Sequence, residues 1–171
     1  MSGRRAVFLD RDGVITQEPP HYAHRVDQLK FIPGAPEAIR SLNQNGYLVI
    51  VVTNQSGIGR GYYLEEDTIK FNQAMEQKLD KYGARIDAIY YCPHHPDDHC
   101  ECRKPKPGML LDAGKRFNIN FTQSFMVGDR MSDIEAGEHV GCETILVLDQ
   151  PDMDHTKIDL TAAVQWIKSK A

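Results

Sequence analysis

The chain lacks an excess of positive charge. Its 171 residues include 20 Lys and Arg against 24 Asp and Glu, which gives a formal net charge of −4. No basic field is available to attract a nucleic-acid backbone or an anionic membrane surface. We therefore expect neither nucleic acid nor a membrane among its partners.

Long apolar runs are missing as well. The longest run, Tyr47 to Val52, is far shorter than the roughly 20 residues that cross a bilayer. The first run, 6–9, is shorter than the apolar region of about 7–15 residues in a signal peptide. We therefore expect a cytoplasmic protein. Thiols stay reduced there, so the four cysteines need a purpose other than disulfide bonds.

Short apolar runs alternate with helical patterns, and no low-complexity tract divides them. The length fits one domain, so we expect a single domain over 1–171 that ends in a tail, 149–171, without a motif. Strands are predicted at 6–10, 47–53, 86–91, 124–128 and 143–148. Helices are predicted at 36–45, 107–117, 132–140 and 162–168, with a further helix through Phe71, Met75, Leu79 and Tyr82 that closes at Gly83. This alternation predicts an α/β fold with a parallel sheet, helices on both faces and the functional groups at the carboxyl ends of the strands.

The first predicted strand ends in Asp10-Arg11-Asp12-Gly13. Two carboxylates one residue apart after a buried strand resist joint ionisation, and a hard divalent cation removes that conflict. The competing interpretations are an ordinary Asp- and Gly-rich surface turn, or part of a calcium loop, which also contains Asp-x-Asp-Gly.

Polar side chains follow two further strands. The second strand leads into Thr53-Asn-Gln-Ser-Gly, where hydroxyl, amide and backbone donors suit a phosphate group, although a plain polar loop has the same composition. The fourth ends in Gly128-Asp129, and Asp129 is a candidate metal ligand. For Asp133 we favour a structural role at the helix start, where Ser132 and Glu135 form a capping-box pattern.

A basic stretch, Arg103-Lys-Pro-Lys-Pro-Gly108, lies between these motifs. A lysine in a proline-stiffened loop is a good partner for phosphate, and an arginine can bind a second phosphate through its two-pronged guanidinium. A solvated basic run is the alternative.

Cysteine and histidine are concentrated in the loop 92–102. Three thiolates and one imidazole match a closed, tetrahedral structural zinc site. We predict Cys92, His94, Cys100 and Cys102 as the zinc ligands, with His95 and His99 as alternates. A reactive or redox cluster is the competing interpretation. The fourth cysteine, Cys142, is predicted to be a small buried residue.

Together, the four strand-end fragments resemble the haloacid dehalogenase superfamily of phosphatases, in the family's order from Ala6 to about Leu148. The resemblance implies a Rossmann-like, doubly wound parallel sheet. No large insertion follows the first or third motif, so we expect no large cap domain and an open site.

The same resemblance implies a mechanism. Asp10 is expected to attack phosphorus and form an aspartyl-phosphate, and Asp12 to act as general acid and then general base. Mg²⁺ is expected to bind Asp10, the backbone carbonyl of Asp12, and Asp129. Thr53 and Lys104 are expected to stabilise the phosphoryl group in transfer.

The zinc loop followed by Arg103-Lys-Pro narrows the resemblance to two small groups of phosphatases. One removes the 7-phosphate of D-glycero-D-manno-heptose 1,7-bisphosphate and leaves heptose 1-phosphate. The other hydrolyses histidinol phosphate, and the short zinc loop is more like that group. The segments 53–61, 92–96 and 103–111 look most like the heptose enzymes, so we predict that activity and keep histidinol phosphate as the alternative.

The expected partner is a small phosphorylated sugar bound by a monomer. Arg103 is expected to recognise the distal 1-phosphate, with help from Arg130. In a different class, the chain would be a non-catalytic, zinc-stabilised interaction domain or a phosphate-accepting receiver, but a receiver has no use for a general acid such as Asp12. The complete set of predicted substrate contacts is Arg11, His21, Tyr22, Asn54, Gln55, Ser56, Arg103 and Arg130.

Overall fold

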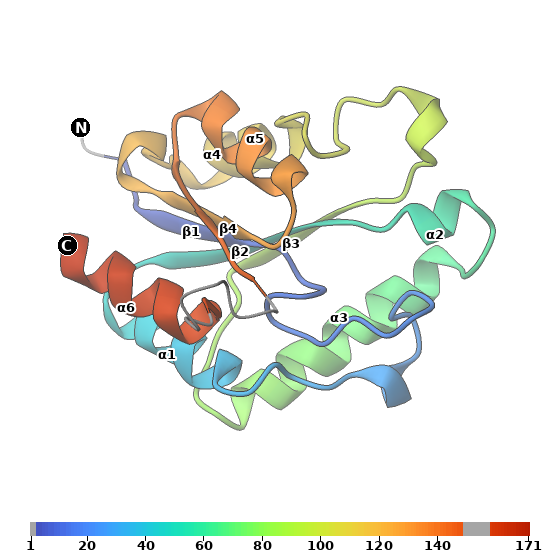
Figure 1. Cartoon of the computed structure of the whole chain (residues 1–171), viewed down its shortest axis with the longest axis horizontal. Coiled ribbons are helices and arrows are strands. Elements are labelled where there is room, and N and C mark those ends of the chain that lie inside the picture. Colours follow the sequence, from blue (N-terminus) through green and yellow to red (C-terminus); the bar gives the residue numbers. More distant parts are fainter. Residues whose placement is uncertain (1–2, 149–157) are drawn as a thin grey trace.

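A five-stranded parallel sheet forms the centre of the molecule in a computed structural model, which describes residues 3–148 and 158–171 (Figure 1). The strands are β1 (Ala6–Leu9), β2 (Leu48–Asn54), β3 (Ala88–Cys92), β4 (Phe125–Gly128) and β5 (Glu143–Leu146), in the order β3-β2-β1-β4-β5. All five predicted strands are thus confirmed, with ends that differ by a residue or two. β1 and β4 are buried along their whole length and β2 along nearly all of it, because parallel central strands are covered on both faces.

Helices cover both faces of the sheet. On one face lie α1 (Ala35–Gln44), α3 (Glu65–Asp80) and α6 (Leu160–Lys170), and on the other α4 (Gly108–Phe117) and α5 (Met131–Val140) (Figure 1). Alternate residues of β1 therefore enter two separate apolar cores: Val7 and Leu9 face the first group of helices, and Ala6 and Phe8 the second. This is the predicted two-faced α/β arrangement. No helix in the described part of the chain is long and apolar enough to span a membrane.

The shorter elements lie in the connections. They are the single turn α2 (Ser56–Gly59) and the 3₁₀ turns Val26–Gln28, Pro96–Asp98 and Phe121–Gln123. Within residues 3–148 and 158–171 the connections are loops and turns of this kind, so no cap domain covers the sheet edge, as predicted. Of the predicted tail, 149–171, residues 149–157 lie outside the described residues, and the rest contains α6.

Two local predictions were wrong. The box that caps α5 does not use Ser132 and Glu135: the N-cap is Arg130, two residues earlier, and the Arg130 N–H donates to the Asp133 carboxylate at 3.1 Å. A carboxylate at the third helical position does this work whatever the N-cap residue is. In addition, α3 ends at Asp80, so Tyr82 lies beyond it and is largely exposed.

Strand register brings the motifs together. Leu9 pairs with Val51 of β2 and with Val127 of β4. The residues that follow these three positions therefore emerge at one edge of the sheet. The Asp10 N–H then donates to the Val127 carbonyl at 3.1 Å, which fixes the start of the first loop against β4.

Candidate active site

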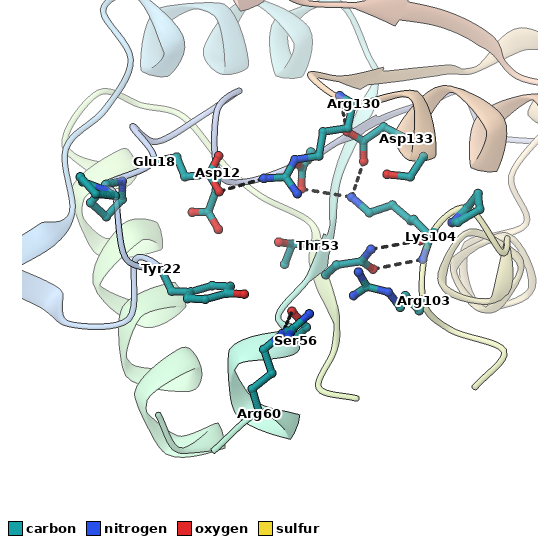
Figure 2. A pocket seen from close by; sticks show the side chains of 16 residues that line it. Asp12, Glu18, Tyr22, Thr53, Ser56, Arg60, Arg103, Lys104, Arg130 and Asp133 are labelled. Carbon is teal, nitrogen blue, oxygen red and sulfur yellow. Dashed lines mark hydrogen bonds and ion pairs between the residues drawn. The ribbon is translucent and has the colours of Figure 1, made fainter. Parts of the chain in front are cut away.

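A cavity of about 520 Å³ opens at the carboxyl ends of β1, β2 and β4 (Figure 2). It contains all four predicted catalytic side chains and five of the eight predicted substrate contacts. These residues are Asp10, Asp12, Thr53 and Lys104, with Tyr22, Asn54, Ser56, Arg103 and Arg130. The predicted contacts Arg11, His21 and Gln55 do not line it.

Lys104 is the buried cation of the site and is 3% exposed. Its ammonium group donates to Asp10 Oδ1 at 3.1 Å, to Asp133 Oδ1 at 2.5 Å and to the Val52 carbonyl at 2.7 Å. Burial disfavours the charged ammonium, but the two carboxylates outweigh burial and raise the pKa of Lys104 above its usual range. Lys104 therefore stays protonated and is held beside Asp10.

Three carboxylates converge around this lysine. Oxygens of Asp10, Asp129 and Asp133 lie within 4.8 Å of one another, so one ammonium leaves an excess of negative charge. Burial, and then the charges of Asp10 and Asp133, raise the pKa of Asp129 to about 7. Burial and the charge of Asp133 also raise the pKa of Asp10, against the opposing effect of Lys104.

This carboxylate group fits a divalent cation. Asp129 Oδ1 is buried and has no hydrogen-bond partner among the described residues, which is costly unless something else binds it. Carboxylate oxygens are the ligands that Mg²⁺ prefers. Asp133 has the predicted structural role, because it caps α5, and it also contributes the second ion pair of Lys104, which the sequence did not reveal.

Gly13 allows the first loop to pass close to this group. Its φ is +86°, and a Cβ at this position would collide with the Asp129 carboxylate. A side chain here would therefore both strain the backbone and displace Asp129.

Asp12 is held by an arginine that the sequence assigned to the substrate. Arg11 Nε and Nη2 donate to the two oxygens of Asp12 at 3.0 and 3.1 Å. Arg11 is fully buried: it also donates to Asn72 Oδ1 at 3.1 Å and lies 4.2 Å from the centroid of the Phe71 ring. The Arg11 guanidinium therefore does not reach the cavity surface and instead orients Asp12.

Gln55 also orients Asp12 from below the cavity surface. Its amide Nε2 lies 3.2 Å from Asp12 Oδ2 and 2.9 Å from Thr53 Oγ1 and donates to both, and its Oε1 accepts from the Tyr63 hydroxyl at 2.7 Å. Gln55 is 2% exposed. A side chain so enclosed positions its neighbours, and the structure does not bring it to the cavity surface.

His21 lies in a neighbouring cavity of about 470 Å³, which is lined by aromatic rings. Tyr22 lines both cavities, and Figure 2 shows its hydroxyl directed into the catalytic one. The segment around His21 and Tyr22 has no helical or strand period, so its path could not be predicted, and only Tyr22 reaches the predicted position.

The remaining predicted contacts surround Lys104. The Asn54 amide forms two hydrogen bonds with the Lys104 backbone, at 3.1 and 3.2 Å, and thereby locks the basic loop to the end of β2. Arg130 reaches across the cavity to Glu18 at 3.0 Å. Arg103 has a buried Nη1 without a hydrogen-bond partner in the described residues.

Glu18 and Arg60 line the cavity but were not among the predicted site residues. Arg60 stands between two glycines in the turn that was assigned to phosphate through its backbone donors. The side chain was missed because nothing in that pattern tells which way it points.

The predicted zinc ligands form a second cluster. Cys92, His94, Cys100 and Cys102 meet with sulfur–sulfur distances of 3.0–3.6 Å and sulfur–nitrogen distances of 3.2 and 3.4 Å. Tetrahedral ligands at a Zn–S distance of about 2.3 Å are separated by roughly 3.8 Å. The four ligands converge to somewhat shorter separations than this, and the donor set suits zinc.

The alternate ligands point elsewhere. His95 Nδ1 accepts a hydrogen bond from the Asp97 N–H at 3.1 Å at the start of a 3₁₀ turn, and His99 ends that turn with a φ of +52°. Neither belongs to the cluster of potential ligands. Cys142 is buried, as predicted, and burial raises the pKa of its thiol to about 12.

The cysteine loop packs directly against two cavity segments. A Cβ on Gly59 of α2 would collide with the backbone of His94 and His95, and a Cβ on Gly108 would collide with that of Glu101. The backbone of the loop therefore packs against the backbone of α2 at one place and against that of the start of α4 at the other.

Known proteins share this arrangement. Residues 7–85 match the family described as "Haloacid dehalogenase-like hydrolase", and residues 101–161 match a related HAD-hydrolase-like family. A relative from Pasteurella multocida is 47% identical over 79% of this chain and 76% of its own length, and one from Yersinia pestis is 39% identical over 95% and 88%. Both are named D-glycero-beta-D-manno-heptose-1,7-bisphosphate 7-phosphatase.

Solved structures agree. The D,D-heptose 1,7-bisphosphate phosphatase from B. bronchiseptica, described as complexed with magnesium and phosphate, superposes with a TM-score of 0.87. It is 33% identical in sequence, and the match covers 98% of this chain and 99% of that one. Given the strand-end carboxylates, the buried lysine and these relatives, the chain belongs to the haloacid dehalogenase-like hydrolases and is a phosphatase.

Proposed function

We propose that the enzyme removes the 7-phosphate of D-glycero-β-D-manno-heptose 1,7-bisphosphate, releasing heptose 1-phosphate and inorganic phosphate. One observation carries the chemistry: Asp10, Asp12, Thr53 and Lys104, which are distant in sequence, line one cavity. The names of relatives at 39–47% identity support the substrate and its β anomer. They do not favour histidinol phosphate, and membership of a phosphatase family argues against a non-catalytic receiver.

The cavity residues suit Mg²⁺ as the catalytic ion. Asp10, Asp129 and the backbone carbonyl of Asp12 are the proposed ligands, and the unpartnered Asp129 Oδ1 supports this assignment. When bound, the ion neutralises negative charge on the carboxylates and on the phosphoryl group. Zinc is proposed as a structural ion at the cysteine loop, where four protein ligands leave no open position for water.

The first chemical step belongs to the two aspartates. An Asp10 oxygen bonds to the 7-phosphorus, the bond from phosphorus to the sugar oxygen breaks, and Asp12 donates a proton to that oxygen. Lys104 holds Asp10 in place and offers positive charge beside the transferring group. The Thr53 hydroxyl accepts a hydrogen bond from Gln55 at 2.9 Å, so its own proton is free to donate to a phosphoryl oxygen.

The second step reverses the proton demand. Asp12, now a carboxylate, removes a proton from a water molecule whose oxygen attacks phosphorus, and the bond from phosphorus to Asp10 breaks. The sugar has departed by then, so the water has room to approach. The hydrogen bonds from Arg11, Gln55 and Thr16 keep Asp12 in one orientation through both steps.

The proposal is tested by measuring phosphate release in the presence of Mg²⁺ from the β bisphosphate, its α anomer and histidinol phosphate. We expect the β bisphosphate to have the highest kcat/KM. Asp10→Asn should abolish release from every substrate, because an amide is not a nucleophile towards phosphorus. Asp27→Asn, an exposed aspartate paired with Arg25, is the matched control and should be fully active. Preferred turnover of histidinol phosphate, or ordinary turnover by Asp10→Asn, would contradict the proposal.

A further inference from the structure

The charges of the cavity are distributed unevenly. Lys104 pairs with Asp10 and Asp133, and Arg130 pairs with Glu18. Asp12 pairs with Arg11, a buried arginine that does not line the cavity. Across residues 3–148 and 158–171, no carboxylate pairs with the other two lining cations, Arg60 and Arg103. Arg60 and Arg103 therefore carry the positive charge of the cavity that no carboxylate of the described residues neutralises.

Arg60 and Arg103 occupy one side of the cavity. Figure 2 shows Arg60 next to Ser56 and Arg103 next to Lys104, while Arg130 lies on the other side of Thr53 in this view. Arg60 Nε donates to Ser56 Oγ at 3.4 Å, which turns the side chain along the cavity wall.

The turn that carries Arg60 is fixed from outside the cavity. Gly59 lies against the backbone of the cysteine loop, which also leads directly into Arg103. The Arg60 N–H donates to the Ser56 carbonyl at 2.9 Å, and the Tyr62 N–H donates to the Gly57 carbonyl at 2.8 Å, so the turn is closed by its own backbone. One loop therefore sets the relative position of both arginines.

We propose that Arg60 is a specificity-determining residue that binds the distal phosphate of the bisphosphate substrate together with Arg103. The inference rests on the proposed function, which supplies a substrate with a second dianion. Two unpaired guanidiniums attract such a group and bind it through charge-assisted, forked hydrogen bonds. Arg130, expected from the sequence to help at this phosphate, has Glu18 as its partner and lies on the opposite side.

The test compares heptose 1,7-bisphosphate with heptose 7-phosphate, which presents the same reacting group without the distal one. Arg60→Gln should raise KM for the bisphosphate roughly tenfold, the low end for hydrogen bonds to a charged group, and leave kcat and all constants for heptose 7-phosphate unchanged. Arg60→Lys keeps the positive charge but loses the two-pronged guanidinium, and its KM for the bisphosphate should be intermediate. Arg116→Gln, an exposed arginine on α4, is the matched control and should behave like the wild type.

Unchanged kinetics of Arg60→Gln on the bisphosphate would overturn the inference. An equal loss of kcat/KM on both substrates would also overturn it. Arg60 would then act at the reacting phosphate or support the structure of the whole site. A wild-type enzyme that hydrolyses heptose 7-phosphate or an aryl phosphate but ignores the bisphosphate would contradict the proposed function itself, and this inference with it.

Discussion

Tyr63 illustrates how a residue outside the catalytic cavity can act on its chemistry. Its hydroxyl donates to Gln55, and Gln55 donates to both Asp12 and Thr53. Without that hydroxyl the Gln55 amide loses the bond that fixes its orientation. The two groups that depend on Gln55 are the proposed proton donor and a proposed phosphoryl ligand.

Tyr63→Phe should therefore lower kcat roughly 2- to 10-fold, the effect of one net hydrogen bond, and leave KM nearly unchanged. The measurement is steady-state kinetics over a range of pH, because misorientation of Asp12 changes the pH profile whereas a purely structural defect does not. Tyr62→Phe, whose ring is 62% exposed, is the control and should retain full activity. If Tyr63→Phe had the kcat and pH profile of the wild type, the hydrogen bond from Tyr63 would not be needed to orient Gln55.

At this scale the sequence predicts reacting groups better than supporting ones. Asp10 and Asp12 could be placed at the site because they directly follow a buried strand, whose end fixes their position, and the family resemblance supplied their roles. Arg11, Gln55 and His21 were assigned to the substrate without knowledge of which way their side chains point. Which face of a loop a side chain occupies depends on packing against distant partners, such as Phe71 beneath Arg11, and no local pattern encodes that.

Among the elements, the cysteine loop connects a structural cluster to the proposed substrate site. It leads into Arg103 and Lys104 and packs on Gly59 and Gly108. Disorder in this loop would release the arginines of the distal-phosphate site, and substrate binding would then have to restore their order at an entropic cost.

Cys100→Ser should therefore lose zinc and raise KM for the bisphosphate more than it lowers kcat. Zinc content is measured by elemental analysis beside the kinetics. The control is Cys142→Ala, because Cys142 lies at the start of β5 outside the cluster, and it should keep both zinc and KM. A zinc-free Cys100→Ser enzyme with unchanged kinetics would show that the loop needs no metal to hold the arginines.

Element boundaries were less predictable than the elements themselves. The helix 132–140 was expected to start at a Ser-x-x-Glu pattern, but Asp133 caps it at Arg130, two residues earlier. Both patterns are present in the sequence. The choice between them depends on Lys104, which holds Asp133 at that end of the helix although it is far away in the chain.

For the whole molecule, the carboxylate group couples stability to pH and to Mg²⁺. In the metal-free protein the pKa of Asp129 is raised to about 7 from its usual 3.8. The folded state therefore holds this proton at pH values where the unfolded state has lost it. The contribution to stability is fully present below the unfolded pKa and is lost as the pH rises through about 7. Asp10, with a pKa raised in the same direction, adds to the effect.

The melting temperature of the metal-free protein should accordingly fall as the pH rises towards 7. Mg²⁺ must displace the Asp129 proton at low pH and need not do so at pH 8, so the rise in melting temperature on adding Mg²⁺ should be larger at pH 8 than at pH 5.5. Asp129→Asn should largely remove this dependence, and Asp112→Asn, an exposed carboxylate on α4, should not. A Mg²⁺ effect independent of pH would contradict the assigned role of Asp129.

The overall architecture followed from the sequence because its signal repeats along the chain. Five apolar runs separated by helical periods favour a parallel sheet, and in such a sheet all strand ends meet at one edge. The irregular segment 11–33 resisted prediction for the opposite reason. It is held by single contacts, such as the isolated bridge of Thr16 with Phe31, and these leave no periodic trace in the sequence.

The cavity has a floor of strand ends and a rim of three separate turns, which contribute Glu18 and Tyr22, Ser56 and Arg60, and Arg103. Under the proposed function, bond cleavage depends on the floor and on Lys104, whereas the choice of sugar depends on the rim. A lineage can therefore exchange one surface turn and acquire a new substrate without rebuilding its reaction centre. The same partition offers protein engineers three short cassettes for redirecting the enzyme to other phosphate esters.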